Sequence, residues 1–212
     1  MSRGKDSGTT TRKLTMMGAF DSLWLSLSAP VKPNRGLEGR DVVKESAARL
    51  LVEGLKEAGI EVVTCLPEGL LKPLYKMLME EKDLKLIFVT NEGEGAGIAA
   101  GAWLGGKKSV LIMENSGLRM STEVLARFGL THGIPVMMIM SHRGEIGEAN
   151  WWGIAHSQTM EPILKALNIP YIIIRDEQEI KGAIRRATRH MATSLYHVAL
   201  VLSGETLGED YV

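Results

Sequence analysis

The sequence predicts an α/β fold with a six-stranded, mostly parallel open sheet and helices on both faces. From about residue 40 onward, six short apolar segments alternate with longer segments whose apolar residues recur every three or four positions. Such alternation is typical of parallel strands joined by right-handed helical crossovers. The short segments are continuously apolar, so we expect both faces of the sheet to be covered by helices.

The composition divides the chain into three parts. Residues 1–39 are rich in Ser, Thr, Gly and Pro, and we expect a flexible N-terminal arm there. Its apolar patch at 20–27 either docks on the fold or a partner, or belongs to an extension without structure. The predicted domain spans residues 40–205, and residues 206–212 are expected to form a tail.

Charge and cysteine content narrow the classes of function. The 25 basic and 25 acidic residues cancel, so nothing favours binding to nucleic acid or to an anionic membrane. The single cysteine, Cys65, excludes an internal disulfide and a multi-cysteine metal site, and favours a cytoplasmic location. No apolar run approaches the roughly 18 residues of a membrane span, and the apolar patch near the N-terminus is interrupted by Asp21 and lacks a signal-peptide cleavage site.

The first half of the domain follows this pattern closely. Asp41 can cap a helix that runs to residue 58 and ends at Gly59. The β-branched segment 60–66 is expected to form a strand, and Pro67 opens the turn that leads to a helix over 70–81. A strand over 86–89 follows.

The next helix, expected over 93–104, consists almost entirely of Gly and Ala. Each glycine costs a helix interior up to about 1 kcal/mol relative to alanine. Gly95, Gly97 and Gly101 therefore indicate that something packs very close to this helix backbone. The apolar segment 109–113 is expected to form the strand after it.

The remaining elements complete the alternation. A helix over 119–128 and a strand over 134–140 precede a long polar loop, 141–158. A helix over 159–167 and a strand over 171–174 come next. Asp176 and Glu179 have the spacing of a capping box for a helix that reaches residue 190, and the last strand is expected over 197–202.

The turns that follow the strands are the places to look for a site, because open parallel sheets bind ligands beyond the carboxyl ends of their strands. Glu92 and Glu94 lie in one such turn, where a carboxylate complements the dipole of the next helix. Gly95–Ala100 also fits the G-x-G-x-x-A pattern of dinucleotide-binding domains, with Glu114 at the end of the next strand. However, that pattern places its first glycine directly after the strand, whereas here residues 90–94 intervene.

Residues 91–101, Asn-Glu-Gly-Glu-Gly-Ala-Gly-Ile-Ala-Ala-Gly, resemble the N-E-x-x-A-x-x-A-A-x-G signature of thiamine-diphosphate-dependent decarboxylases, in their pyrimidine-binding domain. Three other turns are similar to motifs of the same family: 66–74 to P-x-x-x-L-K-P-L, 114–118 to N-S-G-L, and 141–144 to S/W-x-R-G. The resemblance covers roughly residues 40–205. It is closest to the alpha subunits of sulfopyruvate decarboxylase, with phosphonopyruvate decarboxylase second.

The resemblance assigns the catalytic role to Glu92, with Glu94 as the alternative. In this family a glutamate hydrogen-bonded to N1′ of thiamine diphosphate favours the cofactor's reactive imino tautomer, while the cofactor supplies the electron sink. The resemblance further implies cofactor contacts in the matched turns, from Glu92 together with Pro67, Asn91, Asn115 and Gly117.

The substrate implied by the resemblance is a doubly anionic 2-oxo acid. Arginine suits a sulfonate or phosphonate because its planar fork donates two hydrogen bonds. Candidate substrate-binding residues in or beside the matched turns are Lys72, Asn115, Ser116, His142, Arg143 and His156. The segment 145–158 departs from the family pattern, and its Trp151 and Trp152 either close over the substrate or cover the core.

The family's diphosphate and magnesium motif, G-D-G followed by an Asn-rich segment, is missing from this sequence. The resemblance therefore implies a hetero-oligomer in which a diphosphate-binding beta subunit holds Mg²⁺ and the diphosphate. The expected reaction converts 3-sulfopyruvate to sulfoacetaldehyde and CO₂. Open alternatives are phosphonopyruvate or another 2-oxo acid as substrate, and a non-catalytic partner subunit of the same fold.

Overall fold

In the computed structural model, which describes residues 43–148 and 150–208, six strands form one fully parallel sheet. The strand order is β2-β1-β3-β4-β6-β5. The strands are β1 (Val62–Cys65), β2 (Lys85–Phe88), β3 (Ser109–Glu114), β4 (Met137–Ser141), β5 (Tyr171–Ile174) and β6 (Val198–Leu202). The predicted α/β class is confirmed, and the sheet is parallel throughout.

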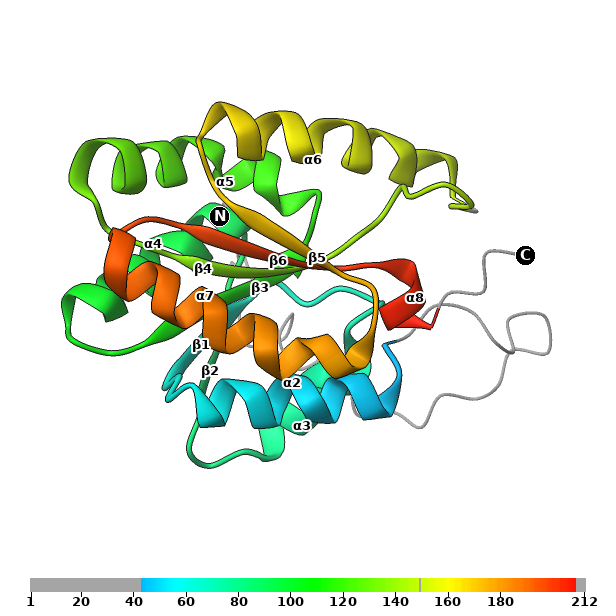
Figure 1. Cartoon of the computed structure of the whole chain (residues 1–212), viewed down its shortest axis with the longest axis horizontal. Helices are drawn as coiled ribbons and strands as arrows, with labels where there is room; N and C mark the ends of the chain where they lie inside the picture. The colour runs from blue at the N-terminus through cyan, green and yellow to red at the C-terminus, as the bar shows by residue number, and fades with distance from the viewer. Residues whose placement is uncertain (1–42, 149, 209–212) are drawn as a thin grey trace, which may run out of the picture. The chain divides into compact units, whose positions relative to one another are not determined.

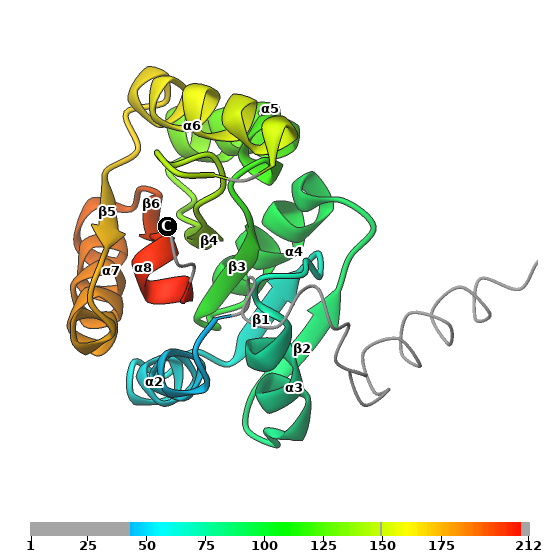
Figure 2. The same ribbon diagram turned by 90° about the vertical axis from the view of Figure 1, so that its right-hand side faces the viewer.

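Helices cover both faces of the sheet, as Figures 1 and 2 show. The longer helices are α2 (Glu45–Glu57), α3 (Lys72–Glu80), α4 (Glu92–Leu104), α5 (Gly117–Ala126), α6 (Ile154–Ala166) and α7 (Ile180–Ser194). Helices α2, α3 and α7 pack together on one face, and α4, α5 and α6 pack on the other. A short helix, α8 (Gly204–Leu207), follows β6 at the end of the domain. None of the helices in the described part of the chain is long and apolar enough to cross a membrane.

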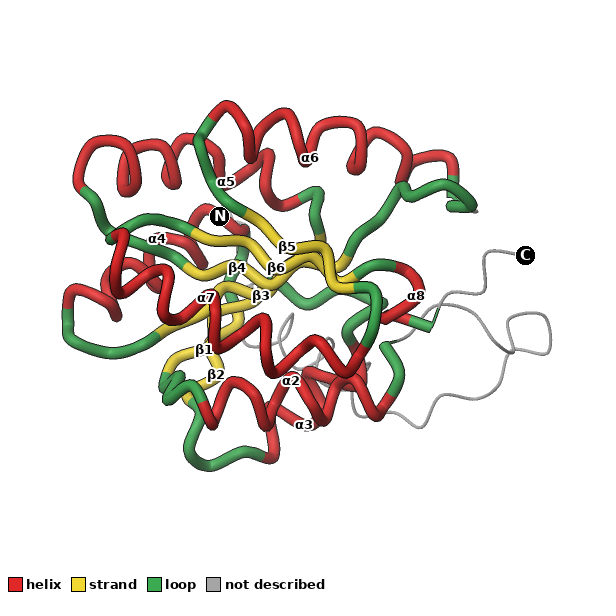
Figure 3. Tube along the Cα trace, in the orientation of Figure 1, coloured by secondary structure: helices red, strands yellow, loops and turns green. Residues whose placement is uncertain are grey.

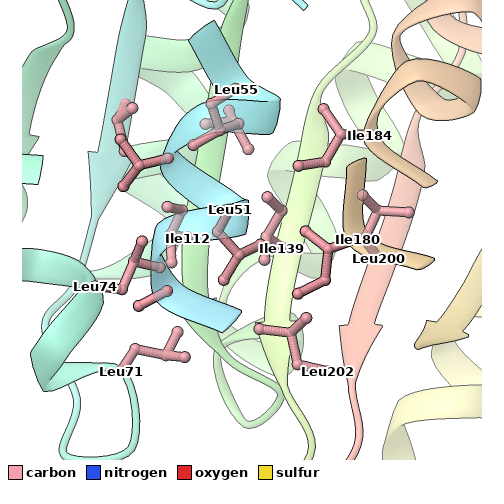
Figure 4. Packing of buried hydrophobic residues seen from close by; sticks show 14 of the residues in the cluster. Leu51, Leu55, Leu71, Leu74, Ile112, Ile139, Ile180, Ile184, Leu200 and Leu202 are labelled. Atoms are coloured by element: carbon pink, nitrogen blue, oxygen red, sulfur yellow. The ribbon is translucent and has the colours of Figure 1, made fainter. Parts of the chain in front are cut away.

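Two apolar clusters, one on each face, hold the layers together. In the α2/α7 layer, Leu51, Leu55 and Ile184 are fully buried against strand residues such as Ile139 and Leu200 (Figure 4). The second cluster joins α4, α5 and α6 to the opposite faces of the same strands. The four inner strands β1, β3, β4 and β6 are buried along almost their whole length, as expected for mostly apolar strands covered on both faces. The edge strands β2 and β5 are only partly buried, and all six strands form the middle layer seen in Figure 3.

Several boundaries differ from those that the sequence predicts. Helix α2 begins at Glu45, and Asp41, its expected cap, lies outside the described residues. Helix α6 begins at Ile154 after the 3₁₀ turn Trp151–Gly153, so the last third of the expected loop 141–158 is helical and the prediction is wrong there. Most residues in this first part of α6 are exposed or partly exposed and several are polar, so the segment lacks the apolar spacing that predicts a helix. The tail expected from residue 206 begins inside α8, whose Leu207 is fully buried.

A buried histidine explains why α5 runs on as a π-helix, Arg127–Thr131, beyond its expected end. His197, at the start of β6, accepts a hydrogen bond from the Val136 N–H at Nδ1 (2.9 Å), and its Nε2 donates to the Leu125 carbonyl (2.8 Å). Burial lowers the pKa of His197, which keeps the ring neutral. The ring lies against the backbone of Gly129, where a Cβ would come within 2.5 Å of Nε2.

The Gly129→Ala variant should therefore unfold at lower denaturant concentration than the parent, with a loss of about 1–3 kcal/mol, because the added methyl overlaps the His197 ring. Gly101→Ala is the matched control. Its Cβ would meet nothing within 4 Å among the described residues, so the better helix former should raise stability by up to about 1 kcal/mol. Urea unfolding followed by circular dichroism measures both, and equal stability of Gly129→Ala and the parent would contradict this packing.

Candidate active site

The candidate site lies at the edge of the sheet where the parallel strands end, which is the side that faces the viewer in Figure 2. The strand order places β1 between β2 and β3, so the chain leaves β1 and β3 in opposite directions. Such a switch point is where open α/β sheets bind ligands. The turns after β1, β3 and β4 meet there, with Glu114 of β3 directly beside Ser141 of β4.

Asn115 locks two of these turns together. Its side-chain amide donates to the Arg143 carbonyl (2.9 Å), and its Oδ1 accepts from the Arg143 N–H (3.2 Å). Its own N–H donates to the Ser141 carbonyl (3.0 Å). Asn115 is buried, so the predicted site residue fixes the positions of the β3 and β4 turns relative to one another.

Glu94 has a structural role at the start of α4. Asn91 caps the helix through its Oδ1, which accepts from the Glu94 N–H (2.9 Å). The Glu94 carboxylate accepts hydrogen bonds from the Thr90 N–H (2.7 Å) and hydroxyl (2.8 Å). These hydrogen bonds lower the pKa of Glu94. Glu94 is thus occupied in closing the turn before α4.

Glu92 differs because its carboxylate forms no hydrogen bond or ion pair within the described residues. The half-buried side chain lies on the backbone of Gly117 at the start of α5. A Cβ on Gly117 would come within 2.6 Å of Glu92 Oε1 and 2.7 Å of Cδ. A side chain at position 117 would therefore displace the Glu92 carboxylate from this place.

Close packing fixes the helix that carries Glu92. A Cβ on Gly95 would come within 2.7 Å of Leu111 on β3, and the Thr64 hydroxyl donates to the Gly95 carbonyl (3.1 Å). The expected close approach is therefore confirmed at Gly95, and the neighbour is the sheet itself. Gly97 and Gly101 differ, since a Cβ at either position would meet nothing within 4 Å among the described residues.

The predicted basic residues gather at the start of α6, each near a carboxylate. His142 Nδ1 lies 3.3 Å from Glu145 Oε1, and its Nε2 lies 3.1 Å from the Ser157 hydroxyl. Arg143 Nη1 lies 3.4 Å from Glu148 Oε1, and its guanidinium lies over the Trp152 ring, 5.3 Å from the centroid. Both basic side chains are largely buried.

The remaining predicted residues are divided between this cluster and the β1 turn. His156 lies on α6, not in a loop as expected, with Nδ1 3.1 Å from Glu114 Oε1. The Ser116 hydroxyl donates to the same oxygen (2.6 Å). Pro67 lies in the turn after β1, and Lys72 is the first residue of α3.

The sequence did not reveal the two carboxylates that lie beside the basic side chains, Glu145 beside His142 and Glu148 beside Arg143. Burial opposes ionisation of Glu145, but hydrogen bonds from His142 and the Gly204 N–H, together with the charge of Arg175, lower its pKa to about 2. Glu148 accepts from the backbone N–H groups of Gly144 and Asn150 as well as facing Arg143. The signal available in the sequence was the spacing: Glu145 follows His142 by three positions, and Glu148 follows Arg143 by five.

Glu68 is the other missed residue. It lies in the turn after β1 and is partly exposed, but its Oε1 is buried without a hydrogen-bond partner within the described residues, and its Oε2 accepts from the Leu70 N–H (2.6 Å). Burial raises its pKa to about 7; Glu114 adds to the rise, while the Leu70 N–H, Ser141 and Arg143 oppose it. No cluster of three His, Cys, Asp or Glu side chains within the described residues is arranged to hold a metal ion.

Comparison with known proteins identifies relatives of this chain. Residues 45–160 match the model of the thiamine pyrophosphate enzyme, N-terminal TPP binding domain. The chain is 32% identical to the sulfopyruvate decarboxylase subunit alpha of Methanococcus maripaludis, over 74% of this chain and 94% of the relative. It is 34% identical to the same subunit of Methanocaldococcus jannaschii, over 71% and 89%.

A shorter match reaches a second type of decarboxylase. The phosphonopyruvate decarboxylase of Streptomyces viridochromogenes is 39% identical over 46% of this chain and 25% of its own length. Among solved structures, a 2-oxoglutarate:ferredoxin oxidoreductase from Magnetococcus marinus has a similar fold, with a TM-score of 0.58 and 14% identity over 79% of this chain and 30% of that chain.

Glu145→Gln should be less stable than the parent at neutral pH by about 1–2 kcal/mol, and the difference should shrink progressively as the pH falls from about 4.5 to about 2. The pKa of Glu145 is lower in the folded chain than in the unfolded chain. Its carboxylate therefore stabilises the fold above about pH 4.5, and this contribution is lost as the pH falls toward 2. Urea unfolding at several pH values measures the difference. Glu205→Gln, an exposed change on α8, is the control, and a Glu145→Gln deficit that persists unchanged to pH 2 would contradict the assignment.

Proposed function

Since the chain belongs to the family of thiamine pyrophosphate enzymes that have the N-terminal TPP binding domain, we propose that it is the alpha-type subunit of a two-subunit 2-oxo acid decarboxylase. The proposed reaction converts 3-sulfopyruvate to sulfoacetaldehyde and CO₂. The observation that carries the proposal is the Glu92 carboxylate, which lies over the backbone of Gly117 and has no hydrogen-bond or ion-pair partner within the described residues.

The residues present fit thiamine diphosphate. When bound, this cofactor supplies the electron sink that allows CO₂ to leave. Glu92 would hold the proton shared with N1′ of the aminopyrimidine, because its carboxylate lies over Gly117 and is unengaged within the described residues. Asn91 supports that role indirectly by capping α4 through the Glu94 N–H. Asn115 and Gly117 shape the turn on which Glu92 lies, and Pro67 belongs to the neighbouring turn after β1.

The basic cluster suits a substrate with two negative charges. The Arg143 guanidinium lies 3.4–3.5 Å from Glu148, and a sulfonate can accept two hydrogen bonds from such a fork. His142 contacts Ser157 on α6, the helix that also carries His156. The Ser116 hydroxyl and His156 both lie close to Glu114 Oε1. Phosphonopyruvate is the second candidate substrate, because a phosphonate offers the same oxygens and the chain has phosphonopyruvate decarboxylase relatives.

A partner chain is needed to complete this site. The family's diphosphate motif is missing from the sequence, and we assign Mg²⁺ and the diphosphate to a diphosphate-binding beta subunit in a hetero-oligomer. Gly97, Gly101 and Leu104 lie on one stripe of α4, and the structure supports this stripe as its contact surface. Nothing described lies within 4 Å of a Cβ at either glycine, and Leu104 is 70% exposed. The single cysteine supports a cytoplasmic complex.

Glu92→Gln should lower the rate of sulfopyruvate decarboxylation by about 100-fold or more, since the amide cannot share the N1′ proton. The assay mixes the chain with a candidate beta chain, thiamine diphosphate and Mg²⁺, and follows aldehyde release. A separate titration of thiamine diphosphate distinguishes loss of turnover from loss of cofactor. Glu94→Gln is the matched control and should retain turnover. Full activity of Glu92→Gln would contradict the role of Glu92, and a parent complex that binds the beta chain without turning over any 2-oxo acid would favour a non-catalytic subunit.

Gly97→Phe should weaken association with the beta chain by about tenfold or more, which corresponds to at least about 1.4 kcal/mol. The large side chain would stand on the open stripe of α4 without disturbing the fold of the isolated chain. Gly182→Phe, on α7 at the opposite face of the sheet, is the matched control. Sedimentation of the mixed chains measures the affinity. Parent-like affinity of Gly97→Phe would exclude this stripe from the interface.

A further inference from the structure

Trp152 contacts two of the basic side chains of the candidate site. The Arg143 guanidinium lies over the Trp152 ring, 5.3 Å from its centroid. The His156 ring contacts the same indole, with the two ring centroids 5.6 Å apart and the ring planes at 51°. Arg143 belongs to the turn after β4, whereas His156 belongs to α6. One indole therefore joins basic groups from two elements of the fold.

The local structure explains how Trp152 reaches both groups. It lies in the 3₁₀ turn Trp151–Gly153, which continues directly into α6. Trp152 precedes His156 by four residues, a spacing that places two side chains on the same side of a helix. Trp151, one position earlier, is instead 86% exposed. The two neighbouring tryptophans thus have different surroundings, and only Trp152 contacts the basic groups among the described residues.

The turn that carries Trp152 is held by the carboxylate that faces Arg143. Glu148 Oε1 accepts hydrogen bonds from the Asn150 N–H (2.9 Å) and side-chain amide (3.0 Å), and it lies 3.4 Å from Arg143 Nη1. The Gly153 N–H donates to the Asn150 carbonyl (2.9 Å). A Cβ on Gly153 would come within 3.0 Å of the Glu148 carboxylate. Glu148 therefore places the guanidinium and the indole relative to one another.

Trp152 packs on charged groups and not on the apolar core. In the described part of the chain, neither apolar cluster includes it, and it is 40% exposed. The Arg143 and His156 side chains that it contacts are only 10% and 13% exposed. Of the two roles expected for this tryptophan, these contacts favour a place beside the substrate over a cover for the core.

We propose that Trp152 positions Arg143 and His156 to bind the second anionic group of the 2-oxo acid, and thereby makes the site selective for doubly anionic substrates. This inference rests on the proposed function. The ring attracts the guanidinium placed over its face, and the edge of a guanidinium is what donates hydrogen bonds to a sulfonate or phosphonate.

Ordering the arginine in advance is what gives the selectivity. A long arginine side chain loses much rotamer freedom when it binds an anion. If the indole has already restricted that freedom, the anion binds at a lower entropic cost. Pyruvate, whose only anionic group is the carboxylate next to its keto carbon, has no second anion to benefit from this arrangement.

Trp152→Leu tests the proposal because leucine removes the aromatic ring and keeps an apolar side chain. In the complex reconstituted with the beta chain, this variant should raise the KM for sulfopyruvate about tenfold, which corresponds to about 1.4 kcal/mol. The kcat should stay within about twofold of the parent value, since the lost interaction acts on binding. The inhibition constant of pyruvate, measured as a competitor, should not change.

Two further variants separate positioning from a structural effect. Trp152→Phe keeps an aromatic face beside Arg143 and should restore most of the affinity for sulfopyruvate. Trp151→Leu is the matched control on the neighbouring exposed residue and should behave as the parent.

A second readout requires neither the partner chain nor turnover. In the full chain alone, NMR relaxation of the Arg143 Nε–H group should give an order parameter above about 0.6 in the parent and well below it in Trp152→Leu. Trp152→Phe should stay close to the parent.

A parent-like KM for sulfopyruvate or an unchanged Arg143 order parameter in Trp152→Leu would overturn the proposal and leave the proposed function intact. Equal weakening of sulfopyruvate and pyruvate binding would also overturn it, because a merely structural tryptophan predicts that result. A parent complex that releases no aldehyde from any 2-oxo acid would instead overturn the proposed function, and the substrate selectivity with it. The order parameter would then still decide whether Trp152 positions Arg143.

Discussion

The close approach of α4 to the sheet and to α5 is the constraint on which the candidate site depends. Gly95 allows the helix to lie against Leu111, and Gly117 allows the Glu92 side chain to lie on the backbone of α5. With a Cβ at either position the helix or the carboxylate would have to move. Gly95 lowers the stability of α4 relative to alanine, but it lets the helix that carries Glu92 lie close against the sheet.

Carboxylates control the electrostatics of the rest of the site. Glu145 and Glu148 hold His142 and Arg143 in largely buried positions, and Glu114 does the same for His156. These three basic side chains are therefore oriented before any anionic substrate arrives, which reduces the cost of ordering them on binding. This arrangement also means that each of them interacts with the substrate in competition with a neighbouring carboxylate.

The sequence predicted the fold well, because the burial of a strand leaves a local signal in its sequence. It predicted the six strands, the helix that carries Glu92 and the structural role of Glu94. It missed the helical start at Ile154 and the importance of Glu68, since neither has a local signature. Burial of a single carboxyl depends on how distant turns meet, and the π-helix depends on the distant His197 ring.

In the proposed function this chain presents half of a site, with the Glu92 carboxylate open to a cofactor whose diphosphate is bound by the partner chain. A structure of the chain in complex with a beta-type chain, thiamine diphosphate and Mg²⁺ tests this most directly. The account predicts Glu92 within hydrogen-bond distance of N1′ and the diphosphate held only by the partner. A diphosphate bound by this chain, or a different carboxylate at N1′, would contradict it.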